Sequence, residues 1–143
     1  MIWTNPLLPA TSMVILTATV WIRLYVERIS EMRSSRISAQ QLSTSHESDA
    51  LLRNTLASDN FKNLFEIPVL FYVLCVALVA THTQTPFFSV GLWLFVGLRA
   101  AHSLIHCSYN KVMHRFTVYL LSTVLLFVMW IQFGLALLKT TAT

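Results

Sequence analysis

Long apolar runs separated by short polar segments dominate the chain. Four runs, at residues 7–26, 64–80, 86–104 and 116–138, are almost entirely apolar. Because a helix needs about 20 mostly apolar residues to cross a bilayer, the runs predict four transmembrane helices. The run at 64–80 is short, and we expect polar helical residues before it to add length. The pattern predicts an all-α integral membrane protein, a four-transmembrane-helix bundle with a single domain over residues 1–143.

Local signals refine this prediction at three places. Residues 29–49 are rich in Ser, Arg and Gln and predict a loop. Pro68 lies early in the second apolar run, where its missing N–H and its clash with the Leu64 carbonyl predict a kink. Gly97 and Ala101 are four residues apart on the third helix, a spacing that would let another helix approach closely.

The distribution of basic residues predicts the orientation of the helices. The chain is 55% hydrophobic with a formal net charge of +4. Its basic residues gather between the first and second runs and between the third and fourth, at Arg23, Arg28, Arg33, Arg36, Arg53, Lys62, Lys111 and Arg115. By the positive-inside rule these connections are cytoplasmic and both termini lie outside the cytoplasm. The basic excess thus reflects topology, and we expect no nucleic-acid partner.

Ionisable residues gather in the segment 99–119, RAAHSLIHCSYNKVMHRFTVY, although only 11% of the chain is charged. On a helix at about 100° per residue, one narrow stripe holds Arg99, His102, Ser103, His106 and Asn110. Ionisable side chains within a membrane are costly unless they face the bundle interior, so they indicate a functional site by default.

Polar residues on other helices are expected to face the same region. Asn60, Asn63 and Glu66 are spaced by threes before Pro68, and Arg115 and Tyr119 open the fourth helix. Arg23 is placed to pair with Glu27, with its guanidinium directed either to the interface or into the bundle. Glu66 should have an arginine partner, Arg99 or Arg115, because an isolated buried carboxylate is unfavourable. Convergence of these groups indicates a polar, anionic ligand reached from the cytoplasm, and a purely structural ion pair is the alternative.

Two other interpretations of the polar residues are weaker. His102 and His106 are four residues apart, with Cys107 or His114 nearby. A zinc site needs three or four converging ligands and spacing alone supplies two, so we expect no metal. Cys75 and Cys107 fall at different depths, and we expect buried thiols without a disulfide.

Three local patterns resemble the superfamily of membrane-associated proteins in eicosanoid and glutathione metabolism (MAPEG). They are Ala57-x-x-Asn60 followed by Pro68, Arg99-x-x-His102-Ser103, and Arg115-x-x-x-Tyr119. The interval from Arg99 to Arg115 and the basic first connection also match the family. The chain departs from it with Leu56 in place of arginine, Asn63 in place of an acid, His106 in place of tyrosine, and Phe116 where some members carry serine. This version resembles a bacterial branch.

The resemblance implies a homotrimer that binds glutathione between neighbouring subunits near the cytoplasmic side. It implies that Arg115 faces the glutathione sulfur, with Tyr119 one turn further in, and these are the candidate catalytic residues. The candidate glutathione-binding residues are Arg23, Asn60, Asn63, Glu66, Arg99, His102 and His106. The implied activity is a glutathione-dependent transferase or peroxidase acting on a lipophilic substrate from the bilayer.

Whether the chain is an enzyme stays open, because a non-catalytic structural or accessory membrane subunit could be built on the same scaffold. In either case the expected partners are lipids, a lipophilic small molecule and other copies of the chain, and the expected location is the bacterial inner membrane.

Overall fold

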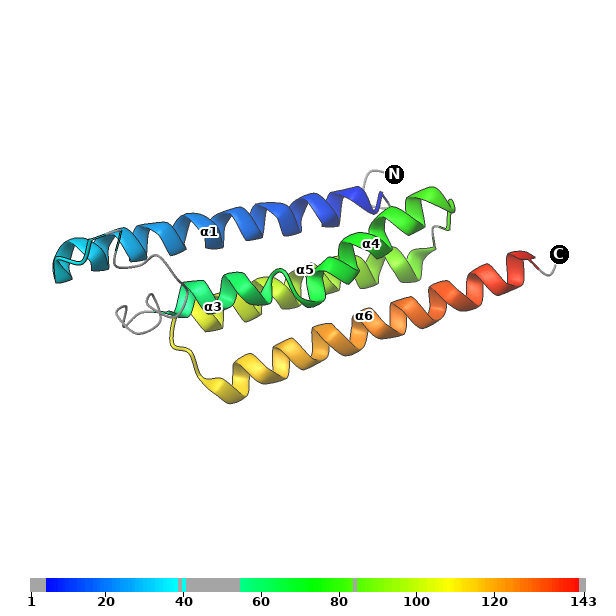
Figure 1. Ribbon diagram of the computed structural model, residues 1–143. Helices are drawn as coiled ribbons and strands as arrows, with labels where there is room; N and C mark the ends of the chain where they lie inside the picture. Colours follow the sequence, from blue (N-terminus) through cyan, green and yellow to red (C-terminus); the bar gives the residue numbers. More distant parts are fainter. Residues whose placement is uncertain (1–4, 39, 41–54, 84, 142–143) are drawn as a thin grey trace.

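The computed structural model describes residues 5–38, 40, 55–83 and 85–141 (Figure 1). In chain order the helices are α1 (Leu7–Ser35), α3 (Leu56–Asn63), α4 (Ile67–Ala80), α5 (Pro86–Cys107) and α6 (Val112–Thr141). With α3 and α4 taken together, four helical segments are long and apolar enough to cross a membrane. The predicted all-helical, four-span fold is therefore confirmed.

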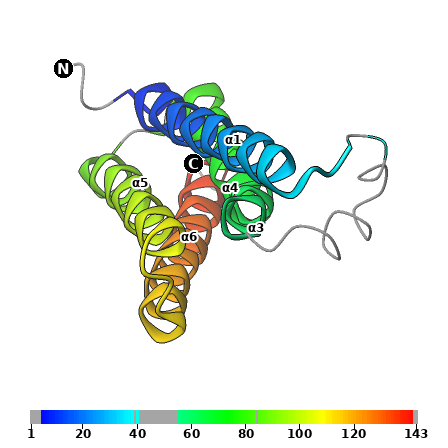
Figure 2. The same cartoon turned by 90° about the vertical axis from the view of Figure 1, so that its left-hand side faces the viewer.

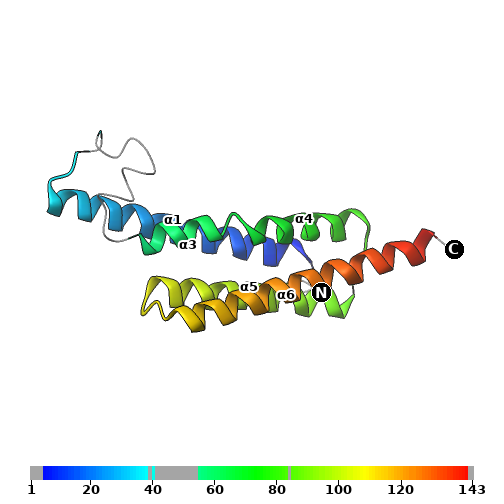
Figure 3. The same ribbon diagram turned by 60° about the horizontal axis from the view of Figure 1, so that its bottom comes forward.

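The helices run side by side along one long axis (Figures 1 and 3). α5 packs along α6, while α1 contacts α3, α4 and α5. Figure 2 looks along the bundle and shows the first half of α6 on the far side of α5 and α3 from α1. The start of α1 and the end of α6 lie at the same end, as an even number of crossings requires. The end of α1, the start of α6 and α3 lie at the opposite end.

The second span is broken rather than gently kinked. α3 ends at Asn63, and Glu66 precedes α4 with a non-helical φ of −93° and ψ of −102°. Pro68 lies in the first turn of α4, where the missing N–H costs nothing. The break thus falls just before Pro68, at the Leu64 carbonyl with which the proline ring would clash in an unbroken helix. As expected, the helical residues of α3 extend the short apolar run.

Helix boundaries differ from the apolar runs at the polar ends. α1 continues to Ser35 and ends at Arg36, which has a left-handed φ of 55°. The first part of the predicted loop is therefore helical, because hydropathy marks where a helix leaves the bilayer and not where it ends. Of the rest of that loop, residues 39 and 41–49 lie outside the described residues.

Large apolar side chains from the four spans form the core. The ring of Phe71 on α4 stacks on that of Phe95 on α5, with centroids 4.4 Å apart. A Cβ added at Gly91 of α5 would lie 2.6 Å from the Met129 Sδ on α6, whereas one at Gly97 would meet nothing within 4 Å. The close approach of α5 and α6 is thus at Gly91. The prediction that placed it at Gly97 and Ala101 is wrong within the protomer, because Gly97 lies on an exposed face.

Candidate functional site

Polar side chains are buried where α3, the second half of α5 and the start of α6 meet. Arg99 is 0% exposed, His102 and His106 are each 1% exposed, and Ser103 is 4% exposed. The stripe predicted on the third helix therefore does face the bundle interior. Its last member, Asn110, lies beyond the end of α5 with a positive φ of 44°.

Among the described residues, Arg99 has no acidic side chain within salt-bridge distance. Its Nη2 donates to the Asn63 carbonyl at 2.5 Å, and its guanidinium carbon lies 5.1 Å from the centroid of the Tyr119 ring. In an unbroken helix the Asn63 carbonyl would accept the N–H of residue 67, so the break in the second span frees it for Arg99. Nε and Nη1 of Arg99 are buried without a hydrogen-bond partner in the described part of the chain.

The predicted ion pair of Glu66 with Arg99 or Arg115 is not formed between the described residues. Glu66 is exposed at the helix break, and its carboxylate lies close enough to the Tyr119 hydroxyl to interact with it. The expectation failed because a continuous helix was assumed through residues 64–66. At the break, the Asn63 carbonyl accepts from Arg99 and the Tyr119 ring lies against it, while the exposed Glu66 acts on Arg99 only at longer range.

Arg115 on α6 contacts the turn and the end of α5. Its Nη1 lies 3.1 Å from the His106 Nε2 and 3.0 Å from the Asn110 Oδ1. The His102 ring lies 5.7 Å from that of His106 and 5.6 Å from that of Tyr119, between centroids. The Nδ1 atoms of both histidines are buried and have no partner among the residues described.

These groups surround a pocket of about 200 Å³, lined by Asn63, His102, Val112, Arg115, Phe116 and Tyr119. Four of these residues were predicted site residues, and Arg99 lies beside them against Tyr119 and Asn63. Val112 and Phe116 were not predicted as lining residues. Val112 lies three residues before Arg115, and Phe116 lies three residues before Tyr119. This helical spacing is the signal that could have indicated them.

Arg23 and Asn60 belong to a neighbouring cluster and do not line that pocket. Arg23 Nε pairs with the Glu27 Oε1 at 2.6 Å, as predicted, and its Nη2 donates to the Cys107 carbonyl at the end of α5. Asn60 donates to the Cys107 Sγ at 3.4 Å and accepts from the Ser103 hydroxyl at 3.3 Å. Arg23 thus stays exposed on α1, while its guanidinium reaches across to cap the end of α5.

The thiols and imidazoles show no grouping suited to a metal. Cys75 and Cys107 are both buried free cysteines. Over the described ranges, no three His, Cys, Asp or Glu side chains come together closely enough to hold a metal ion.

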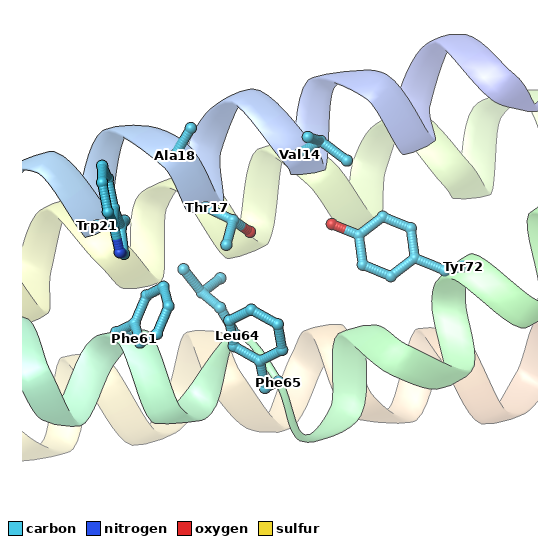
Figure 4. Close-up of a pocket in the computed structure, with 8 residues that line it drawn as sticks. All are labelled: Val14, Thr17, Ala18, Trp21, Phe61, Leu64, Phe65 and Tyr72. Atoms are coloured by element: carbon cyan, nitrogen blue, oxygen red, sulfur yellow. The ribbon is translucent and has the colours of Figure 1, made fainter.

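A second, apolar pocket of about 560 Å³ lies between α1 and the α3–α4 pair. Figure 4 shows its lining residues: Val14, Thr17, Ala18, Trp21, Phe61, Leu64, Phe65 and Tyr72. The Tyr72 hydroxyl points across the gap towards Thr17 (Figure 4). Sequence reasoning missed this pocket. The four-residue spacing of Phe61 and Phe65, whose ring centroids lie 4.9 Å apart, indicates one aromatic face and could have suggested it.

The two pockets lie on different sides of α3. Asn63 lines the polar pocket, while Phe61 and Phe65 line the apolar one. Within one protomer the arrangement therefore offers a cationic site and a separate lipophilic site.

Comparison with known proteins gives one relationship. No curated protein and no solved structure matched the chain. The sequence does match the MAPEG family over residues 6–135, which includes all four spans and both arginines of the site. This match agrees with the four-span helical fold and with the position of the three local sequence patterns on α3, α5 and α6. The chain therefore belongs to the MAPEG family.

Proposed function

We propose that this protein is a membrane-embedded, glutathione-dependent transferase or peroxidase acting on a lipophilic electrophile. The observation that carries the proposal is the positive charge around the polar pocket, which no salt bridge between the described residues balances. Neither Arg99 nor Arg115 is ion-paired in the described part of the chain, and buried nitrogens of Arg99, His102 and His106 lack partners. A buried polar group without a partner costs about 1–3 kcal/mol, so an anionic ligand here would relieve several such penalties.

The residues present fit glutathione, which carries two carboxylates. The forked donors of an arginine suit a carboxylate, and two nitrogens of Arg99 have no hydrogen-bond partner among the described residues. The tripeptide would be held by the pocket residues Asn63 and His102 and by Arg99 beside the pocket. Glu66, beside Tyr119, would accept hydrogen bonds from the glutathione ammonium group. Glutathione supplies a thiol whose ionised form is the nucleophile. Arg115 would favour the thiolate by its charge, and the Tyr119 hydroxyl would donate a hydrogen bond to it.

The small size of the polar pocket supports a site that a neighbouring subunit of the proposed homotrimer completes. Ligand sites commonly measure about 300–1,000 Å³, and the pocket within one protomer is smaller, at about 200 Å³. The apolar pocket in Figure 4 is within that range, at about 560 Å³. Its lining suits an acyl chain or another lipophilic molecule that enters from the bilayer.

The proposed location is a bacterial inner membrane, with both termini outside the cytoplasm. Basic residues cluster at the end of the bundle that holds the polar pocket, on α1, in the connection after it, and around the α5–α6 turn. The positive-inside rule assigns this end to the cytoplasm, so that the site would open towards the compartment where a soluble thiol is kept reduced.

One observation favours a non-catalytic accessory subunit instead. Nη1 of Arg115 already has two acceptors within the protomer, His106 and Asn110. If those contacts complete the role of this arginine, the polar cluster serves to join α5 to α6 and needs no ligand.

Thermal unfolding of the detergent-solubilised protein separates the two functions. Glutathione at 100 times its Kd should stabilise the fold by about 2.7 kcal/mol, and free glutamate at the same concentration should not. Arg115→Leu should weaken the glutathione effect, and the exposed Lys111→Leu, a basic residue on the same turn, should leave it intact. Absence of any shift with millimolar glutathione would favour the accessory role.

A further inference from the structure

Two acceptors from different parts of the chain meet one nitrogen of Arg115. The His106 Nε2 comes from the last turn of α5, and the Asn110 Oδ1 comes from the turn before α6. Both lie within 3.1 Å of Nη1. Asn110 has a left-handed backbone, with a φ of 44°, which asparagine tolerates better than most residues. The turn therefore helps to fix where its side chain points.

The chemistry of the contact fixes the state of the histidine ring. A guanidinium has donors only, so the His106 Nε2 must accept the hydrogen bond and cannot carry a proton. The ring nitrogen that carries the proton is then Nδ1, which is buried and unpartnered among the described residues. A charged donor makes this a stronger contact than a hydrogen bond between neutral groups.

We propose that His106 is a positioning residue for Arg115. By accepting from Nη1, together with Asn110, it holds the guanidinium in one orientation and leaves its other nitrogens available to the pocket that Arg115 lines. A free arginine side chain would sample many rotamers, and ordering it when the ligand binds would cost free energy. This inference rests on the proposed function, in which Arg115 stabilises a thiolate.

Three substitutions of His106 separate acceptor position from side-chain size. The Gln oxygen reaches the place of Nε2, the Asn oxygen reaches the place of Nδ1, and Phe keeps a ring without any acceptor. With glutathione and chlorodinitrobenzene as substrates, we expect His106→Gln to keep kcat/KM within about threefold of the wild-type value. His106→Asn and His106→Phe should lose about tenfold or more, equivalent to about 1.4 kcal/mol, mainly in kcat. His114→Gln, an exposed histidine on α6, is the control and should have wild-type activity.

A second readout needs neither glutathione nor activity. Phenylglyoxal modifies accessible arginines, and peptide mass spectrometry reports the modification of each one in the intact detergent-solubilised protein. Arg115 should react several-fold faster in the Asn and Phe variants than in the wild-type protein or the Gln variant. If this pattern appears in a protein without glutathione activity, the proposed function fails while the positioning contact stands.

A measurement on the wild-type protein keeps the test valid if the Asn or Phe variant fails to fold. ¹⁵N NMR of labelled histidine, with His106 assigned by its loss in the Gln variant, should show protonated Nδ1 and unprotonated Nε2. Protonated Nε2, equal Arg115 modification in all folded variants, or a Gln variant as impaired as the Phe variant would each overturn the proposal.

Discussion

At the scale of single residues, Arg99 connects the fold to the proposed ligand. It is fully buried and is held by the Asn63 carbonyl and the Tyr119 ring, and no acid among the described residues forms a salt bridge with it. An uncompensated buried charge destabilises a fold unless something binds it. We therefore interpret Arg99 as part of a binding site and not as a structural element.

Replacing Arg99 separates these two roles. We predict that Arg99→Met leaves the free energy of unfolding of the ligand-free protein within about 1 kcal/mol of wild type or raises it, because no ion pair is lost. The same change should remove the stabilisation by glutathione. Ser103→Ala, at a buried polar position one turn along α5, should keep that stabilisation. Loss of more than about 3 kcal/mol in Arg99→Met without ligand would instead show that Arg99 supports the fold itself.

At the scale of elements, the break between α3 and α4 and the contact between α5 and α6 set the geometry of the site. The break frees the Asn63 carbonyl for Arg99 and exposes Glu66. The α5–α6 contact, which is tight at Gly91 and Met129, aligns the stripe on α5 with Arg115 and Tyr119 on α6. A substitution at the helix break or at the α5–α6 contact could therefore change the geometry of the site without replacing any of its residues.

The α5–α6 contact gives a prediction with a control on the same helix. Gly91→Ala should destabilise the protein by about 1–3 kcal/mol, because the new Cβ would lie 2.6 Å from the buried Met129 Sδ. Gly97→Ala meets nothing within 4 Å and should be neutral or stabilise by about 0.5–1 kcal/mol through helix propensity. Denaturant unfolding in detergent measures both. Equal effects of the two changes would contradict the close approach assigned to Gly91.

At the scale of the whole molecule, one protomer leaves much apolar surface and an undersized polar pocket. Exposed apolar side chains occur on all four spans, as expected for a surface shared between lipid and neighbouring subunits. We predict that native mass spectrometry from mild detergent will give the mass of three subunits, and that dissociation to monomers will abolish glutathione binding. A monomer that binds glutathione with the same affinity would contradict the homotrimer.

The sequence predicted the spans well because the membrane imposes a length of apolar residues that composition reveals directly. It also predicted that Arg99, His102 and His106 share a buried face, since helical periodicity fixes relative directions. It could not predict the partner of Glu66 or the function of Arg23 as a cap on α5. These depend on a local break and on helix packing, neither of which periodicity encodes. The apolar pocket between α1 and α4 was missed for the same reason.

The central claim is that Arg115 stabilises a glutathione thiolate, and the ultraviolet absorption band of the thiolate tests it most directly. Adding glutathione to the detergent-solubilised protein near neutral pH should produce this band in the wild-type protein and in Lys111→Leu. Arg115→Leu should lose the band while keeping the same oligomeric mass. A thiolate band of undiminished intensity in a correctly assembled Arg115→Leu protein would contradict the account.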